Sequence, residues 1–241
     1  MLAWLAGPSV AGILMTGLIS GRAGYRALLA RLLRWRVGAR WYAVAMLTAP
    51  LVYVVLCFLL SLISSEFSSG ILLTSDKAGL VLMGLAYGLL GGGFLEELGW
   101  TGFAVPRVRQ RHGLVGTGLF VGLLWGAYHF SVIFWATSPS PSGALGVAIL
   151  LAQLFAWLPA YRVLMVWVYD HTQSLLLAML MHASLTAGML ILQPLALAGM
   201  TLLSWLVAFA AAWWLVVAAI AIANGERFWR HGEMATARTA G

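Results

Sequence analysis

Two adjacent glutamates, Glu96 and Glu97, are the residues of this chain whose type and position most clearly indicate chemistry. They lie within an apolar stretch, since residues 80–95 and 98–106 carry no charged side chain. A carboxylate in the hydrocarbon region of a membrane is costly, so such a pair is by default a hypothesis for a functional site. Two neighbouring carboxylates need partners, water or a shifted pKa, and acid–base catalysis uses these conditions. Thr101, four residues after Glu97, shares its helical face.

Two histidines, His129 and His182, belong with this pair because each is a strongly polar residue in a long apolar stretch. A histidine at that depth needs a partner or a wet cavity. Each is therefore either a catalytic group or a structural hydrogen-bonding residue between helices. Helical spacing places Trp125 on the face of His129 and Thr186 on the face of His182.

The elements that position these residues are predicted to be membrane helices. Hydrophobic residues make up 62% of the 241 residues and charged residues only 9%, whereas water-soluble globular proteins have about 25% charged residues. Uncharged apolar runs of about 20 residues predict helical spans. We expect seven, at about residues 3–20, 42–64, 78–104, 114–136, 143–161, 174–192 and 199–223. The expected fold is an all-α, polytopic integral membrane helical bundle, with one domain over residues 1–241 and a short basic cytoplasmic tail at 224–241.

The net charge of +7 is concentrated in the first and third connections and in the tail. The positive-inside rule therefore predicts that the odd connections and the C-terminus are cytoplasmic, in a multi-pass protein of the cell inner (plasma) membrane. The connection at residues 21–40 alternates arginine with leucine and tryptophan, as an amphipathic helix at an anionic leaflet does. We expect membrane lipids as partners of these arginines, and no nucleic acid.

The polar residues lie in three motifs that together resemble the CPBP family of intramembrane endopeptidases, which includes the CAAX protease and bacteriocin-processing proteins (Abi or Rce1-type). Residues 94–106 (FLEELGWTGFAVP) resemble the first family motif and residues 124–129 (LWGAYH) the second. Residues 174–183, which end in Met181-His182-Ala183, resemble the third. The resemblance implies hydrolysis of peptide bonds in a hydrophobic or membrane-anchored (lipid-anchored) peptide substrate near the cytoplasmic face.

The resemblance also implies roles for individual residues. Glu96 and His129 would jointly activate a water molecule. His182, with Thr186 in place of the family's amide, would face the oxyanion, and Glu97 would orient the site. These roles agree with what peptide hydrolysis needs, which is an activated water, stabilisation of the oxyanion and a proton donor for the leaving amine.

Two positions depart from the family pattern. Thr101 stands where the first motif usually ends in Arg, and Thr186 where the third usually ends in Asn. A catalytically impaired member that acts as an immunity, scaffold or binding protein is therefore an alternative function. Arg162 either replaces the missing Arg as a countercharge or is a snorkelling anchor at the cytoplasmic end of the fifth span. Family members usually have eight spans, so a first span is expected to be missing here.

No cofactor is favoured, and zinc remains an alternative. Glu96, His129 and His182 match a His2Glu zinc set, although the His-Glu-x-x-His signature of zinc proteases is absent from the sequence. A proton- or cation-coupled transporter is a further alternative for the same polar residues. It is disfavoured because no polar residues continue outward from the cluster in the same spans.

Overall fold

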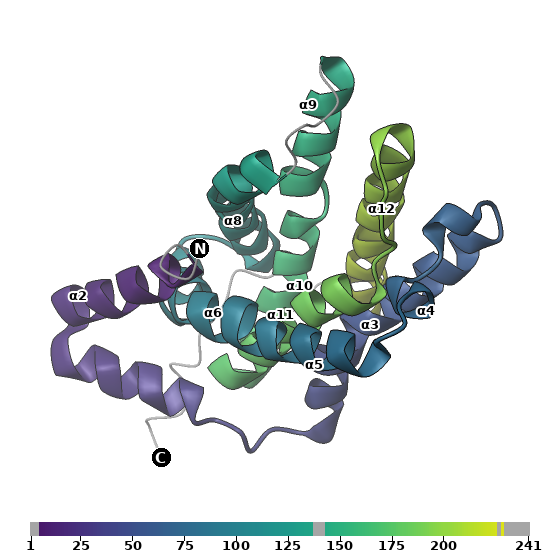
Figure 1. Cartoon of the computed structure of the whole chain (residues 1–241). Coiled ribbons are helices and arrows are strands. Elements are labelled where there is room, and N and C mark those ends of the chain that lie inside the picture. The colour runs from purple at the N-terminus through teal and green to yellow at the C-terminus, as the bar shows by residue number, and fades with distance from the viewer. Residues whose placement is uncertain (1–4, 137–142, 226–227, 229–241) are drawn as a thin grey trace.

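The computed structural model describes residues 5–136, 143–225 and 228, and these residues are almost entirely helical (Figure 1). The longer single helices are α2 (Gly7–Leu32), α3 (Ala39–Ser61), α8 (Leu114–Ala136), α11 (Leu175–Leu192) and α12 (Gly199–Asn224). A short connection contains η1 (Ser65–Phe67) and α4 (Gly70–Leu73). The expectation of an all-α fold is confirmed.

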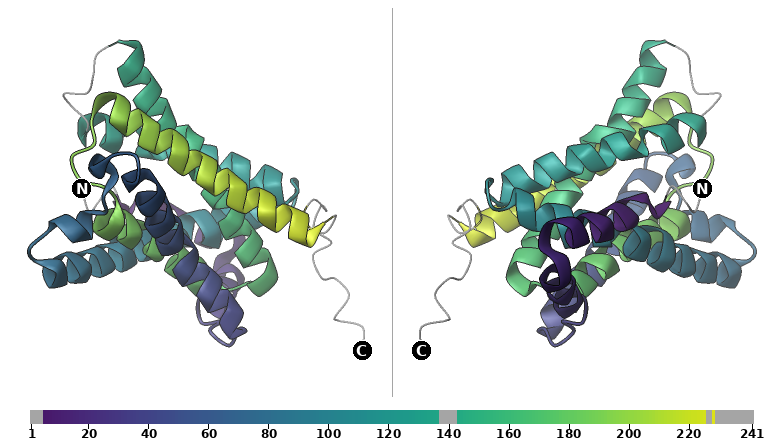
Figure 2. Two further views of the ribbon diagram at one scale, coloured as in Figure 1. Left: turned by 90° about the vertical axis from the view of Figure 1, so that its right-hand side faces the viewer. Right: turned by 90° about the vertical axis from the view of Figure 1, so that its left-hand side faces the viewer.

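Two further helical runs contain π-helical segments. The first comprises α5 (Lys77–Tyr87), η2 (Gly88–Phe94), α6 (Leu95–Gly99), η3 (Trp100–Ala104) and α7 (Val105–Val108). The second comprises α9 (Ala144–Leu151), η4 (Ala152–Ala156) and α10 (Leu158–Thr172). In Figure 1 the run from α5 to α6 lies beside α11, while α8, α9 and α12 extend above it. Figure 2 shows α12 and α8 crossing the upper part of the molecule.

Five helical stretches of the described residues are long and apolar enough to cross a membrane, so the chain is a polytopic membrane helical bundle. They are Ala39–Ser61, Lys77–Val108, Ala144–Thr172, Leu175–Leu192 and Gly199–Asn224. These match five of the seven expected spans. The expected span at 114–136 corresponds to α8, whose apolar part, Leu114–Phe130, is shorter than these five stretches.

The expected first span, residues 3–20, is not among these candidates. Residues 1–4 lie outside the described residues. The backbone of α2 is not helical at Gly21, whose φ is 53° and ψ is −145°, so the first helical segment ends next to the expected residue 20. The second helical segment of α2 continues to Leu32 and contains three arginines. Glycine permits this positive φ without the steric cost of a Cβ. Most of the basic tail expected at residues 224–241 also lies outside the described residues.

The boundary predicted for the fifth span was wrong. Apolarity suggested an end at residue 161, but the helical run continues to Thr172. Nearly every residue of α10 is buried, and this helix packs against α8, α11 and α12. Tyr161 donates a hydrogen bond of 2.5 Å from its hydroxyl to the carbonyl of Met181 on α11. Tyr161 and Arg162, in the first part of α10, therefore lie inside the bundle and not at a membrane surface.

The glycine-rich segment η2 packs directly against α11. A Cβ on Gly88 would lie 2.5 Å from the carbonyl oxygen of Ala183, and one on Gly93 would lie 2.7 Å from that of Met179. Such distances leave no room for a larger residue, so the glycines let two helical backbones approach closely. The π-helical turns of η2 immediately precede the glutamates of α6, and such turns are frequent at functional sites.

Candidate active site

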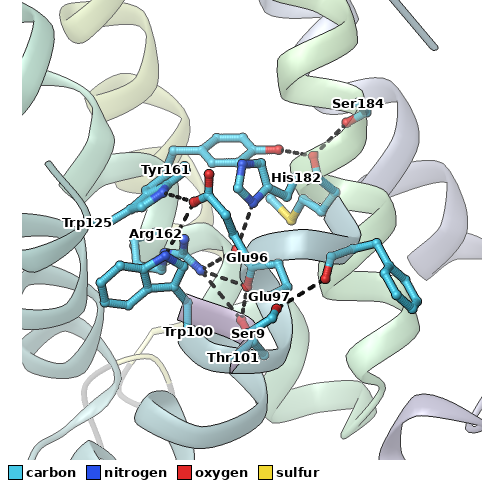
Figure 3. A network of polar contacts seen from close by, with 12 residues as sticks. Ser9, Glu96, Glu97, Trp100, Thr101, Trp125, Tyr161, Arg162, His182 and Ser184 are labelled. Carbon is cyan, nitrogen blue, oxygen red and sulfur yellow. Dashed lines mark hydrogen bonds and ion pairs between the residues drawn. The ribbon is translucent and has the colours of Figure 1, made fainter. Parts of the chain in front are cut away.

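The structure brings the four candidate catalytic residues together from three helices. Figure 3 shows three of them, Glu96, Glu97 and His182, with their hydrogen-bond partners. Glu96 and Glu97 lie on the short helix α6 between two π-helical segments, His129 lies on α8, and His182 lies on α11. All except His129 are almost fully buried. Two clusters result, one around each glutamate.

The carboxylate of Glu97 is surrounded by hydrogen-bond donors from neighbouring side chains. Nη1 of Arg162 lies 3.0 and 2.9 Å from its two carboxylate oxygens, and Nδ1 of His182 lies 2.8 Å from Oε1. The hydroxyl of Thr101 donates to Oε2. Glu97 has no exposed side-chain surface. Because its oxygens already accept several hydrogen bonds, this carboxylate is placed to orient other groups more than to accept a substrate proton.

Arg162 provides the positive charge beside this carboxylate. Its side chain has no exposed surface, so the interpretation as a snorkelling anchor at the membrane surface was wrong. The countercharge interpretation agrees with the ion pair at 2.9 Å. The guanidinium carbon lies 4.2 Å from the centre of the Trp125 ring, a distance suited to a cation–π contact. In the sequence, Thr101 stands where the first family motif usually has an arginine. In the structure, Nη1 of Arg162, from another helix, lies 3.5 Å from the Thr101 hydroxyl.

Glu96 is held by two indole groups. Nε1 of Trp125 donates to Oε2 at 2.9 Å, and Nε1 of Trp100 donates to the same oxygen at 3.3 Å. The second oxygen, Oε1, lies 3.8 Å from Nε2 of His129. One carboxylate oxygen is thus fixed, and the other faces the imidazole. Sequence reasoning did not select Trp100 as a site residue, although its spacing of four residues from Glu96 was the available signal.

The tautomer of His129 follows from its second nitrogen. Nδ1 lies 2.8 Å from the backbone carbonyl oxygen of Trp125. Since a carbonyl oxygen only accepts, we assign the proton of the neutral ring to Nδ1, which leaves the lone pair of Nε2 directed toward Glu96. The side chain of His129 is 21% exposed, against 2% for Glu96. His129 therefore lies at the more open side of this pair.

The carboxylate of Glu96 and the imidazoles of His129 and His182 line one cavity of about 210 Å³. The rest of its wall is mainly apolar or aromatic, and Thr186 is a further polar residue of the lining. Gly92 on η2 closes one side, because a Cβ there would lie 2.6 Å from Oγ1 of Thr186 and 2.8 Å from Nε2 of His182. These two polar atoms therefore flank the same small space.

The zinc alternative does not fit this arrangement. Within the part of the chain that the structure describes, no three His, Cys, Asp or Glu side chains are grouped so that they could hold a metal ion. We therefore derive no step through a metal.

The fold and the site define a polytopic membrane protein with a buried glutamate–histidine cluster, and comparison with known proteins agrees. Residues 77–188 match the family model described as type II CAAX prenyl endopeptidase Rce1-like. This segment contains both glutamates and both site histidines. The chain therefore carries an Rce1-like domain within residues 77–188. The expectation of one domain over residues 1–241 stays a prediction.

A curated relative is CAAX prenyl protease 2 from Methanococcus maripaludis. It is 30% identical to the chain over 69 residues. The matched stretch covers 29% of this chain and 24% of the relative, so the chain matches about a quarter of that protein's length. This similarity agrees with the Rce1-like match and leaves the activity and the substrate of the chain as proposals.

Proposed function

We propose that the chain is an intramembrane endopeptidase that hydrolyses peptide bonds of a hydrophobic or lipid-anchored substrate near the cytoplasmic face. The observation that carries this proposal is the separation of 3.8 Å between Oε1 of Glu96 and Nε2 of His129 at a cavity wall. The family match supports the peptidase class.

The gap between Glu96 and His129 suits one water molecule. Both facing atoms are acceptors when the carboxylate is ionised and His129 is neutral with its proton on Nδ1. A water held between them directs its two hydrogens at these atoms, and a lone pair of its oxygen is then available for attack on a peptide carbonyl. Glu96 takes the proton as general base and returns it to the leaving amine as general acid.

Stabilisation of the tetrahedral oxyanion is assigned to His182 and Thr186. Nδ1 of His182 is held by Glu97, so the ring is oriented with Nε2 toward the cavity. Nε2 donates to the oxyanion when it carries a proton. The hydroxyl of Thr186 supplies a second donor beside the same space. Arg162 keeps Glu97 in place for this role.

The test is cleavage of a quenched library of membrane-anchored peptides by the purified protein in lipid. Glu96→Gln keeps an acceptor for Trp125 but removes the base, and we expect its rate to fall by about 10² to 10⁴. Glu66→Gln is the matched control, because Glu66 lies on η1, is exposed and contacts Thr201. It should cleave at the rate of the unmodified chain. Retained cleavage by Glu96→Gln would refute the assignment of the base.

Two further arms separate the alternatives. A strong chelator followed by added zinc tests the metal alternative, since loss and recovery of cleavage would require a metal site that these side-chain positions do not form. Absence of cleavage by the unmodified chain, with the fold intact by circular dichroism, would favour the immunity, scaffold or binding function. In that case, Thr101→Arg and Thr186→Asn are the first variants to assay for restored cleavage.

A further inference from the structure

A basic cavity lies at the turn between α7 and α8, which follows the two glutamates in the sequence. It has a volume of about 440 Å³, and we call it the basic pocket. Its lining consists of Arg107, Val108, Gln110, Arg111, His112 and Phe120. The apolar run Lys77–Val108 ends at this turn, so the pocket lies at the depth where a membrane's hydrocarbon region gives way to headgroups.

The turn that carries the basic pocket is fixed in place by Arg109. Nη1 of Arg109 donates to the backbone carbonyl of His112 at 2.7 Å, which closes the turn. Nη2 lies 2.6 Å from a carboxylate oxygen of Asp170 at the end of α10. The charge of Arg109 is therefore paired, and the turn is tied to the bundle. A pocket on a fixed turn loses little conformational entropy when it binds a ligand.

Arg107 and Arg111, in contrast, have no carboxylate partner among the described residues. Arg107 donates to the carbonyl of Phe103 at 3.1 Å and to the hydroxyl of Ser20 at 3.4 Å, both of which are neutral acceptors. Its guanidinium also lies 3.7 Å from the centre of the Phe103 ring. Arg31 on α2 is close enough to repel Arg107 electrostatically.

Arg31 adds to the positive charge near the pocket because its own contacts are neutral. It donates to the hydroxyl of Tyr169 at 2.8 Å and to the carbonyl of Gly102 at 2.9 Å. The described side chains around the pocket thus gather guanidinium groups whose charge no protein carboxylate balances. An anion bound from outside the chain would balance it.

We propose that the basic pocket binds the phosphate of an anionic phospholipid headgroup. Arg107 and Arg111 are the phosphate ligands, and His112 borders the same space. Phe120 identifies the source of the phosphate as a lipid: it lines the pocket, is 48% exposed, and stacks on the His112 ring with centroids 6.1 Å apart. This apolar surface suits the first part of an acyl chain. The proposal does not depend on peptidase activity.

The test is a titration of the full chain, purified in a neutral detergent, with short-chain phosphatidylglycerol. Binding is measured from the shift of the thermal unfolding midpoint. Short-chain phosphatidylcholine and inorganic phosphate are titrated separately at the same ionic strength. We expect phosphatidylglycerol to raise the midpoint more than either. An arginine at an anionic surface contributes about fivefold in affinity, so Arg107→Gln with Arg111→Gln should weaken binding roughly 25-fold.

Lys77→Gln is the matched control, because Lys77 is an exposed cation outside the basic pocket, at the opposite end of the apolar run Lys77–Val108. It should bind as the unmodified chain does. If the double variant does not fold, Arg111→Gln alone serves, since Arg111 is exposed, and about fivefold weaker binding is expected. Equal shifts by both lipids, or unchanged binding by the variants, would overturn the proposal. An equal shift by inorganic phosphate would show an anion site that is not a lipid site.

Discussion

Replacement of Arg162 by Met is the most informative perturbation of this protein. The substitution keeps an unbranched side chain in the buried position but removes the positive charge. Among the described residues, Glu97 then retains His182 and Thr101 as donors. The loss also removes the cation–π contact with Trp125, whose indole holds Glu96. A single change on α10 should therefore disturb both glutamate clusters.

The expected magnitude follows from burial. Neither side chain of the Arg162–Glu97 pair is exposed, and one guanidinium nitrogen contacts both carboxylate oxygens at 3.0 and 2.9 Å. Removal of one partner from a buried ion pair costs about 3–5 kcal/mol, because a buried charge is left without compensation. Removal of both charges should cost less than removal of one. The double variant Arg162→Met with Glu97→Gln is thus expected to be more stable than Arg162→Met alone.

Arg162→Lys separates charge from shape. Since the contact with Glu97 is made through one nitrogen, the two-pronged geometry of the guanidinium is not used, and a lysine ammonium keeps the charge. The planar contact with Trp125 is lost, so a cost of about 1 kcal/mol is expected. The Nε and Nη2 atoms of Arg162 have no hydrogen-bond partner among the described residues, so their removal breaks no further hydrogen bond.

The assay is the free energy of unfolding in mixed micelles, followed by circular dichroism during titration with a denaturing detergent. Arg22→Gln is the control and should stay within about 0.5 kcal/mol of the unmodified chain, as exposed substitutions usually do. Arg162→Met within about 1 kcal/mol of the unmodified chain would refute the reasoning. A double variant no more stable than the single one would show that the two charges do not compensate each other.

Three further predictions concern the same bundle. Gly92→Ala places a methyl group 2.8 Å from Nε2 of His182. The free energy of unfolding should fall by about 1–3 kcal/mol in the same titration, and a smaller cost would indicate that α11 moves away. Trp125→Phe removes the donor that lies 2.9 Å from Glu96 and should lower the peptide cleavage rate at least tenfold. An unchanged cleavage rate would contradict this prediction. Arg109→Gln breaks a partly buried ion pair with α10 and should cost about 1–2 kcal/mol, a result that a fully stable variant would contradict.

The sequence by itself determined the class of fold and the positions of the polar residues. Its low charge and long apolar runs predicted a helical membrane protein, because a helix satisfies its own backbone hydrogen bonds where water is absent. The same apolar background made Glu96, Glu97, His129 and His182 conspicuous. Motif spacing was sufficient to indicate the family whose model matches residues 77–188.

Helix boundaries were less predictable, since apolarity does not show where a buried helix ends. The helix expected to stop at residue 161 continues to Thr172 because neighbouring helices cover it. The end of this helix depends on tertiary packing, which hydropathy along the chain does not register. The end expected at residue 20, in contrast, agrees with the structure, because the backbone angles of Gly21 interrupt α2 there.

Only the tertiary structure decided which partner each charged group has. Arg162 lies 65 residues after Glu97, and its sequence position near the end of an apolar run also suited a membrane anchor. The contact arises because α10 is enclosed between α8 and α11, which places the guanidinium against α6. The division of the two glutamates, with Glu97 bound to Arg162 and His182 and Glu96 bound to Trp125, follows from the crossing of these helices and not from spacing along any one of them.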